Sequence, residues 1–328
     1  MKKKRKQISI ILFVLLVLSF LLLLNDTLLS EENKKIYNIS IIVRGRNSES
    51  LMIMKQGIDQ AASEMNANIS FVTLSEENSA SEQMELMNRE IKNKSDAIII
   101  APVDYEKMSE PIENAMNKVP VILIESKVKS EKVLSSISCD NYNLGVSLGK
   151  EMIEMGNKRA NIAIVKNNLE CSSIKDRYDG FMSAIKDTEN TITSWEVSGG
   201  KQSDYYNQAK KLLEDNDVDV VVTFDPSILE TIAEVKKDLS SINKEKTFVE
   251  IYGVGSTSKI ISFLEDKIIS ATAIQNEFNI GYLGVETAVN KINGKKNNNN
   301  NNTISSTVIN IRNMYSEENQ RLLFPFVR

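Results

Sequence analysis

The sequence predicts an α/β protein made of two doubly wound lobes, each with a parallel β-sheet that helices cover on both faces. Short apolar runs alternate along the chain with stretches of helical period. The runs are apolar throughout and not only at every second residue, which is typical of strands buried on both faces. With 328 residues, the chain is long enough for two domains of ordinary size.

The first set of elements follows residue 36. Leu51, Met54 and Ile58 recur at steps of three and four, as one face of an amphipathic helix does. The same alternation predicts strands at 39–43, 69–74, 97–101 and 119–124, with helices at 51–65, 80–91 and 108–116 between them. Parallel strands joined in this way need right-handed crossovers.

The second set of elements follows Ser138. Its apolar runs predict strands at 161–165, 192–197, 218–223, 248–254, 268–274 and 308–311, and its periodic stretches predict helices at 174–185, 209–213, 228–239, 260–264 and 282–289. The lysine and asparagine run at 295–302 can bury nothing, so we expect a surface loop there.

The N-terminal segment has the features of a membrane anchor. A basic cluster in residues 1–7 precedes an apolar run at 8–24 that only Ser9 and Ser19 interrupt. Its length is at the short end of the ~17 to 25 residues that span a bilayer, and the basic cluster is expected on the cytoplasmic side. We therefore predict a basic tip and uncleaved signal anchor at 1–30, a tether at 31–36, and a single-pass cell-membrane protein whose remaining chain is extracytoplasmic.

Cleavage of this segment stays open as the alternative. Residues 24–30 contain no A-x-A-like pair of small residues, and no cysteine near the end of the run could receive a lipid. If the segment is cut, the site is expected before Glu31.

Composition excludes several classes of function. The chain has no histidine, which removes histidine-based acid–base chemistry, and its two cysteines cannot build a metal site. No P-loop, GxSxG or calcium-loop motif is present. The net charge of -4 gives no reason to expect nucleic acid. We predict no enzyme activity, no cofactor and no metal, and a bridge between Cys139 and Cys171 stays open.

Ligands of doubly wound sheets bind beyond the carboxyl ends of the strands. The loops at these ends are 44–50, 102–104, 125–128, 166–173, 224–226, 253–257 and 275–277.

Several segments in and near these loops resemble type I periplasmic binding proteins of the ribose-binding-like group. They are PVILIE at 120–125, Asp140-Asn141, RYDGF at 177–181, VTFD at 222–225, GVGS at 253–256 and ATAIQNEFNIGYLG at 271–284, in the family's order and spacing over 38–313. The resemblance implies lobes at 37–138 plus 276–306 and at 139–275 plus 307–328, joined by three crossing strands. It also implies a hinge that closes on one small ligand, commonly a monosaccharide.

The resemblance implies a binding site that this chain only partly retains. Arg177 and Gln275 stand where the family places an arginine and a hinge glutamine that bind sugar hydroxyls. Glu125 replaces the usual aspartate, Phe224 replaces a polar residue ahead of Asp225, and Gly255 replaces another aspartate. Ser50 and Leu51 replace the aromatic pair that stacks on the sugar ring.

Basic residues stand near the expected cleft. Arg44 and Arg46 in the first loop and Lys127 in a later one join Arg177. Such a group suits a carboxylate or phosphate, so an anionic sugar is one interpretation. The other is that Arg44 and Arg46 are solvated or pair with Glu49 and Glu125. The predicted ligand-binding residues are Arg44, Arg46, Asp104, Glu125, Arg177, Phe224, Asp225 and Gln275.

The sequence leaves three functions open. The anchor and the missing lipid-bearing cysteine favour an extracytoplasmic binding protein that closes on a small sugar and signals to a membrane sensor histidine kinase, as in a two-component system. The alternatives are the substrate receptor of a sugar ABC importer, with its permease as partner, and an interaction scaffold that binds no ligand.

Overall fold

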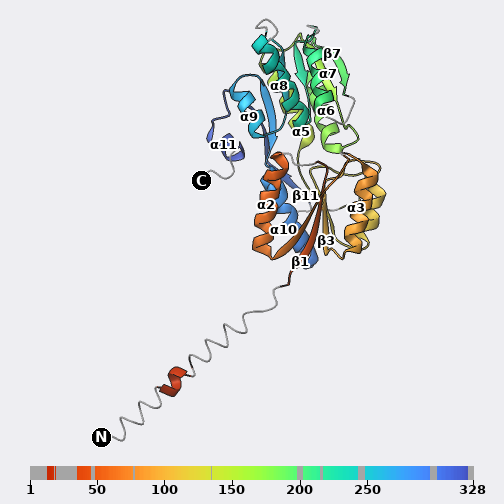
Figure 1. Cartoon of the computed structure of the whole chain (residues 1–328), viewed down its shortest axis with the longest axis vertical. Helices are drawn as coiled ribbons and strands as arrows, with labels where there is room; N and C mark the ends of the chain where they lie inside the picture. Colours follow the sequence, from red (N-terminus) through yellow and green to blue (C-terminus); the bar gives the residue numbers. More distant parts are fainter. Residues whose placement is uncertain are drawn as a thin grey trace, which may run out of the picture. The chain divides into compact units, whose positions relative to one another are not determined.

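The computed structural model contains two six-stranded α/β lobes (Figure 1). The structure describes residues 13–17, 19, 35–45, 49–76, 78–133, 135–197, 202–214, 217–242, 248–295 and 301–323. The chain forms two compact units, Met1–Tyr37 and Asn38–Arg328, and both lobes belong to the second.

The first lobe has the strand order β11-β5-β4-β3-β1-β2. Every strand pair whose register is given in this sheet is parallel. Its elements are β1 (Tyr37–Val43), α2 (Glu49–Met65), β2 (Ala67–Thr73), α3 (Ala80–Lys92), β3 (Ala97–Ile100), α4 (Ser109–Met116), β4 (Val121–Ile124), β5 (Ser136–Cys139), α10 (Glu277–Ile292) and β11 (Asn301–Ile304). Helices α2 and α10 cover one face of the sheet and α3 the other (Figure 1).

The second lobe has the strand order β12-β10-β9-β8-β6-β7, and only β12 runs antiparallel to its neighbour, β10. Its elements are α5 (Asn141–Glu154), β6 (Asn161–Lys166), α6 (Ser172–Ile185), β7 (Thr191–Glu196), α7 (Gln202–Glu214), β8 (Val220–Val222), α8 (Pro226–Ile242), β9 (Glu250–Val254), α9 (Ser258–Glu265), β10 (Ala271–Gln275), β12 (Ser306–Asn310) and α11 (Glu317–Leu323).

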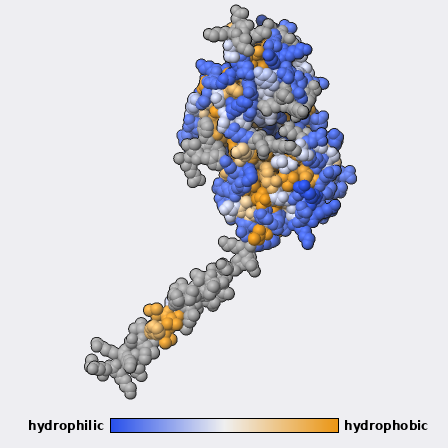
Figure 2. All heavy atoms as spheres, in the orientation of Figure 1, coloured by the Kyte–Doolittle hydropathy of each residue, from blue (hydrophilic) through white to orange (hydrophobic). Residues whose placement is uncertain are grey.

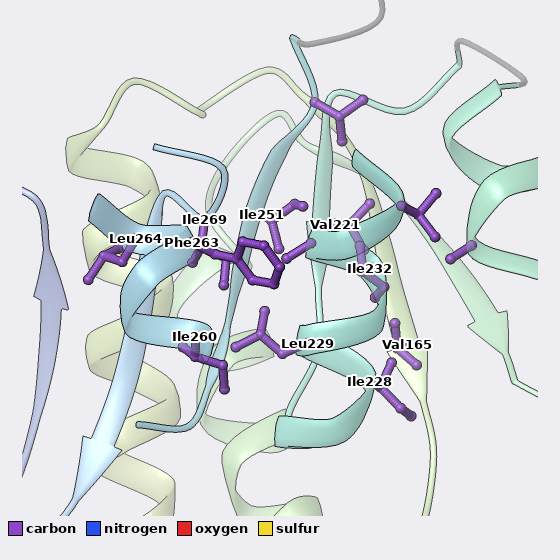
Figure 3. Close-up of a cluster of buried hydrophobic side chains, with 14 of the residues drawn as sticks. Val165, Val221, Ile228, Leu229, Ile232, Ile251, Ile260, Phe263, Leu264 and Ile269 are labelled. Carbon is purple, nitrogen blue, oxygen red and sulfur yellow. The ribbon is translucent and has the colours of Figure 1, made fainter. Parts of the chain in front are cut away.

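The apolar runs form the cores as the sequence predicts. Every residue of β3, β4 and β8 is buried, because helices pack on both faces of these strands. In the second lobe, Val221 and Ile251 from two strands meet Ile232 of α8 and Phe263 of α9 in one apolar cluster (Figure 3). The outer surface is mainly hydrophilic on the face drawn in Figure 2, with an apolar area over the first lobe.

The chain passes between the two sheets at three places. It leaves the first sheet after Cys139, at the end of β5, and returns after Gln275, at the end of β10. It crosses again at Ser305, between β11 and β12. These crossings bring the carboxyl ends of both parallel sheets toward one region.

Two helix pairs pack so closely that only glycine fits between them. A Cβ on Gly145 of α5 would lie 2.0 Å from the carbonyl oxygen of Arg177 in α6, and one on Gly180 of α6 would lie 2.0 Å from that of Tyr142. The first lobe repeats this arrangement between α2 and α10, where a Cβ on Gly281 would lie 2.2 Å from the carbonyl oxygen of Met54. In the second lobe, α5 follows the first crossing and is thereby held against α6, which follows the strand β6. In the first lobe, α10 follows the second crossing and is held against α2, which follows the strand β1.

Several elements lie outside what the sequence predicts. Strand β5 and helices α5 and α11 were not predicted, because SISC in β5 is a short, half-polar run and the apolar positions of α5 are interrupted by glycines. The surface loop expected at 295–302 is wrong for its last two residues, Asn301 and Asn302. They belong to β11, since backbone pairing with β5 at a sheet edge needs no apolar side chain.

Most of the predicted anchor falls outside the described residues. Only 13–17 and 19 of the apolar run at 8–24 are described, and they are helical. Within the described part of the chain, no helix is both long and apolar enough to span a bilayer. The tether predicted at 31–36 is described only at its last two residues.

Two glycines of the same helix provide a test of the close packing. Gly281→Ala places a Cβ against backbone, so we expect the free energy of unfolding to fall by about 1 to 3 kcal/mol. At Gly284 the nearest atom is Ile124 Cγ2 at 3.5 Å, an ordinary contact. Gly284→Ala is therefore expected to be neutral or to stabilise by up to about 1 kcal/mol, as alanine favours helix. Urea unfolding of both variants measures the difference, and equal effects would contradict the packing argument.

Candidate functional site

A cleft of about 140 Å³ lies where the carboxyl ends of the two sheets approach each other. Residues of both lobes line it. The first lobe contributes Val43, Arg44, Gly45, Ser50, Leu51, Met54, Asn78, Glu125 and Glu277, and the second contributes Asn168, Ile174, Arg177, Phe224, Asp225, Pro226, Ser227, Val254, Gly255, Ser256, Ala273 and Gln275. This is the position that the rule for doubly wound sheets predicts.

Arg177 is held in the wall of the cleft by two polar side chains. It projects from the second turn of α6 and is buried. Its Nε donates to Asn141 Oδ1 at 2.7 Å, and its Nη2 donates to Gln275 Oε1 at 3.4 Å. Asn141 also donates to Ser138 Oγ at 2.9 Å, so the guanidinium is oriented by residues of the first crossing. Arg177 and Gln275, both predicted to bind the ligand, thus lie in contact in the wall of the cleft.

Gln275 is the last residue of β10 and connects both lobes' polar groups. Its Oε1 accepts from Arg177 and from Cys139 Sγ, the latter at 3.0 Å. Its Nε2 donates to Glu277 Oε1 at 2.9 Å, across the second crossing. Both ends of the amide are therefore hydrogen-bonded. These bonds fix its orientation, with Oε1 toward Arg177 and Cys139 and Nε2 toward Glu277.

Glu277 is a cleft residue that the sequence did not single out. Its Oε2 is buried and has no hydrogen-bond partner in the structure. Burial, together with the neighbouring charge of Glu125, raises the pKa of Glu277 from 4.5 to about 8, although Arg177 and Arg44 act in the opposite direction. Burial therefore favours the protonated form of this carboxyl.

Arg44 is paired within the protein. Its Nη2 lies 3.9 Å from Glu125 Oε2, and its Nη1 lies 3.1 Å from Cys171 Sγ. Burial acts to lower the pKa of Arg44, but Cys171, Glu125 and the other acids of the cleft outweigh it and raise that pKa. Of the two interpretations of this arginine, pairing with Glu125 is the arrangement that the structure contains.

Glu125 occupies a strained backbone position at the end of β4. Its φ of 59° lies in the left-handed region, which a non-glycine residue adopts at a cost. Its backbone oxygen accepts from Ser138 Oγ at 2.8 Å, and its N–H donates to Ile137 O at 3.0 Å. These bonds hold the strained turn and aim the side chain into the cleft.

The two lobes touch directly around Cys171. Its Sγ lies 3.0 Å from Ser126 Oγ of the first lobe, and that hydroxyl also lies 2.9 Å from Ser173 Oγ of the second. Burial acts to raise the pKa of the Cys171 thiol, but Arg44 and the two hydroxyls outweigh it and lower that pKa. Both cysteines are free, and Cys139 is bonded to Gln275, so the structure contains no bridge between them.

Further contacts between the lobes involve backbone groups. Tyr105 N–H donates to Glu170 O at 2.8 Å, and Lys127 N–H donates to Ser172 Oγ at 2.6 Å. On another part of the rim, Ser258 donates from its N–H and its hydroxyl to the carboxylate of Glu49. The cleft is thus bordered by contacts that need no ligand.

Phe224 and Asp225 line the cleft, but each also has a structural contact. Phe224 is buried, and its ring packs edge-on against Tyr178 and Phe181 at centroid distances of 6.1 and 5.9 Å. Asp225 Oδ1 accepts from the N–H groups of Ser227 and Ile228, which caps the start of α8. Phe224 therefore packs against other aromatic rings and Asp225 caps α8, and both also line the cleft.

The backbone conformation at position 255 explains why this residue is a glycine. Its φ is +145°, and a Cβ there would lie 2.6 Å from Ile260 Cδ1 and 3.0 Å from Pro226 Cβ. A residue with a Cβ would be strained at this φ and would crowd Pro226, so this backbone favours glycine at 255.

Two predicted residues are not placed in the cleft. Asp104 Oδ1 accepts from the N–H groups of Glu106 and Lys107, and its Oδ2 lies 3.1 Å from Lys107 Nζ. It lines a separate hollow that also contains Lys127. Arg46 lies outside the described residues.

Sequence reasoning did not single out Glu277, which lines the cleft, or Asn141, which accepts a hydrogen bond from Arg177. Asn141 belongs to a segment that carries the family resemblance, and Glu277 lies in a loop at the end of a predicted strand, so both could have been proposed from the sequence. The sequence does not show how close these two residues lie to Arg177 and Gln275. Among the described residues, no group of three or more Cys, Asp or Glu side chains could hold a metal ion.

Known proteins share this sequence pattern and fold. The family model described as "Periplasmic binding protein domain" matches residues 39–296. The ribose import binding protein RbsB of Bacillus subtilis (strain 168) is 24% identical over 269 residues, which cover 80% of this chain and 84% of that protein. RbsB of Escherichia coli (strain K12) is 22% identical and covers 79% of this chain and 86% of that protein.

Solved structures are similar over most of the chain. A carbohydrate transporter solute binding protein from Agrobacterium radiobacter, in complex with D-arabinose, has a TM-score of 0.80 and 21% identity and covers 88% of this chain and 98% of its own. The XylFII–LytSN complex contains a chain with a TM-score of 0.75 and 24% identity, which covers 84% of this chain and 98% of its own. At these identities the structures show a shared fold.

The buried carboxyl of Glu277 should make stability depend on pH. Because its pKa is about 8 in the folded protein and near 4.5 when exposed, the folded state binds the extra proton, and stability falls as pH rises through that window. We expect the thermal midpoint of the ligand-free protein to fall between about pH 5 and about pH 9 by a few degrees more in the wild type than in Glu277→Gln, since ~1 kcal/mol is about 2 to 4 °C. Glu286→Gln on the same helix is the control, and parallel profiles for wild type and Glu277→Gln would contradict the prediction.

Proposed function

The chain belongs to the periplasmic binding protein domain family, and on that premise we propose that it is an extracytoplasmic receptor that closes on a small sugar. The observation that carries the proposal is the cleft itself, whose polar side chains come from both lobes. The relatives are binding proteins and not enzymes. The A. radiobacter relative was solved with D-arabinose, and the two RbsB relatives are named for ribose import.

The geometry supports binding by closure of the lobes. A ligand in the cleft reaches Glu125 and Glu277 from one lobe and Arg177, Asp225 and Gln275 from the other. Ligand favours the closed arrangement only through contacts that the open one cannot make. Because Gln275 and Glu277 flank a crossing between the lobes, their bonds to a ligand depend on the hinge angle.

The finer proposal is that the protein remains anchored in the cell membrane and presents its closed state to a membrane sensor histidine kinase. The basic and apolar N-terminal segment, without a cysteine to receive a lipid, supports this role. XylFII, a structural relative, was solved in complex with LytSN. The second candidate is the receptor of a sugar ABC importer, which the import names of the RbsB relatives favour. A neighbouring gene that encodes a kinase supports the first role, and one that encodes a permease supports the second.

A thermal-shift screen tests the sugar-binding proposal. Pentoses, hexoses, sugar acids and sugar phosphates are added to the purified full-length chain, and a ligand at about 100 times its dissociation constant adds about 2.7 kcal/mol to the free energy of unfolding. We expect at least one sugar to raise the thermal midpoint. If none does, the proposal fails and the scaffold without ligand gains support.

Replacement of Arg177 tests the cleft as the binding site. Arg177→Ala removes the guanidinium that Asn141 and Gln275 orient, so we expect calorimetric affinity for the best sugar to weaken by about 1.5 to 3 kcal/mol. Lys175→Ala is the control, because Lys175 is an exposed residue of the same helix that pairs with Asp179. An unchanged affinity in Arg177→Ala would remove Arg177 from the site.

A further inference from the structure

Among the described residues that line the cleft, the buried side-chain polar atom without a hydrogen-bond partner is Oε2 of Glu277. Oε1 of the same carboxyl accepts from Gln275 Nε2 at 2.9 Å, while Oε2 is buried and makes no hydrogen bond. The other two buried side-chain atoms without a partner in the described part of the chain are hydroxyls of Ser135 and Ser136, and neither residue lines the cleft. Glu277 is thus the described cleft residue with a buried side-chain atom that lacks a hydrogen-bond partner.

A buried carboxyl oxygen without a partner is costly for the protein alone. Buried polar atoms are nearly always bonded, and each exception calls for a reason. Glu277 could be replaced by a smaller or apolar residue without loss of any bond except the one from Gln275. A ligand group that bonds Oε2 gives such a reason, because the atom then has a partner whenever the cleft is occupied.

The charges around Glu277 indicate the class of ligand. The acidic side chains near it are Glu125 and Asp225, and the thiol of Cys139 adds a further titratable group. Among the described residues that line the cleft, the two positive groups are already engaged, Arg44 with Glu125 and Cys171, and Arg177 with Asn141 and Gln275. An anionic ligand would meet the carboxylates of Glu125 and Asp225 and would compete with Glu125 for Arg44, whereas an uncharged polyhydroxy ligand does neither.

We propose that Glu277 is a ligand-binding residue whose Oε2 forms a hydrogen bond with a hydroxyl of an uncharged sugar. The inference rests on the proposed sugar-binding function and adds to it a contact and a ligand class. The raised pKa of Glu277 is consistent with this role, because a protonated Oε2 can donate to a hydroxyl oxygen as well as accept.

A double-mutant cycle with deoxy sugars tests the contact. Calorimetry on the purified full-length chain compares D-ribose with 2-deoxy-D-ribose, and D-galactose with its 2-deoxy and 6-deoxy forms, in wild type and in Glu277→Ala. For the sugar that binds, we expect Glu277→Ala to weaken affinity by about tenfold. We also expect wild type to bind one deoxy form about tenfold more weakly than the parent sugar. Glu277→Ala should bind that deoxy form nearly as well as the parent, because the mutation and the missing hydroxyl remove the same hydrogen bond.

Two further variants separate a direct contact from other effects. Asn279→Ala, at an exposed position of the same helix turn, should bind like wild type. Glu277→Gln keeps an oxygen that can accept from Gln275 Nε2 and places an N–H donor where the protonated carboxyl stands, so we expect it to bind the sugar more tightly than Glu277→Ala does. We expect wild type to bind D-galactose more tightly than D-galacturonate, and Glu277→Gln to leave that ratio unchanged, because the protonated carboxyl carries no charge.

Each outcome decides the matter. Equal affinities of wild type and Glu277→Ala, or a deoxy penalty that is the same in both, overturn the contact while the sugar-binding function stands. Tighter binding of D-galacturonate than of D-galactose by wild type overturns the ligand class. If wild type binds none of the sugars in the thermal-shift screen, the proposed function fails and this inference fails with it. Thermal midpoints show that each variant is folded.

Discussion

The close contacts between glycines and the facing helices determine where several residues of the cleft lie. Gly145 packs against the carbonyl of Arg177, and Gly281 packs against that of Met54, and both Arg177 and Met54 line the cleft. A helix pair held at this separation has no room to slide without a clash of backbone with backbone. The α5–α6 pair therefore fixes Arg177 relative to the first crossing, and the α2–α10 pair does the same for the start of α10, where Glu277 lies.

The same crossings that connect the lobes also carry the polar groups of the cleft. Asn141 follows the first crossing, while Gln275 and Glu277 flank the second. Their bonds run from Arg177 through Gln275 to Glu277, so one chain of hydrogen bonds passes from the second lobe to the first. A movement at the hinge must change the geometry of this chain, which joins the state of the cleft to the relative orientation of the lobes.

The sequence predicted the sheets better than the site. Apolar runs such as 97–101 indicate buried parallel strands without any tertiary information, whereas the half-polar β5 and the asparagine-rich start of β11 give no such signal. Arg177, Gln275 and Glu125 could be named because the resemblance to the binding-protein family implies a ligand-binding role for these positions. The pairing of Arg44 with Glu125 and the unpartnered Oε2 of Glu277 could not, since both depend on distances across the lobes. Asp104 also follows a strand, but its side chain turns back onto its own loop.

The contacts that join the lobes without a ligand have a consequence for sensitivity. Bonds such as Tyr105 to Glu170 and Ser258 to Glu49 favour the closed arrangement of an empty molecule. A partner that reads closure cannot distinguish an empty closed molecule from an occupied one. In the proposed signalling role, the strength of the rim contacts would therefore set a background signal in the absence of ligand. It would also set the lowest ligand concentration that raises the signal above this background, independently of how tightly the cleft binds the ligand.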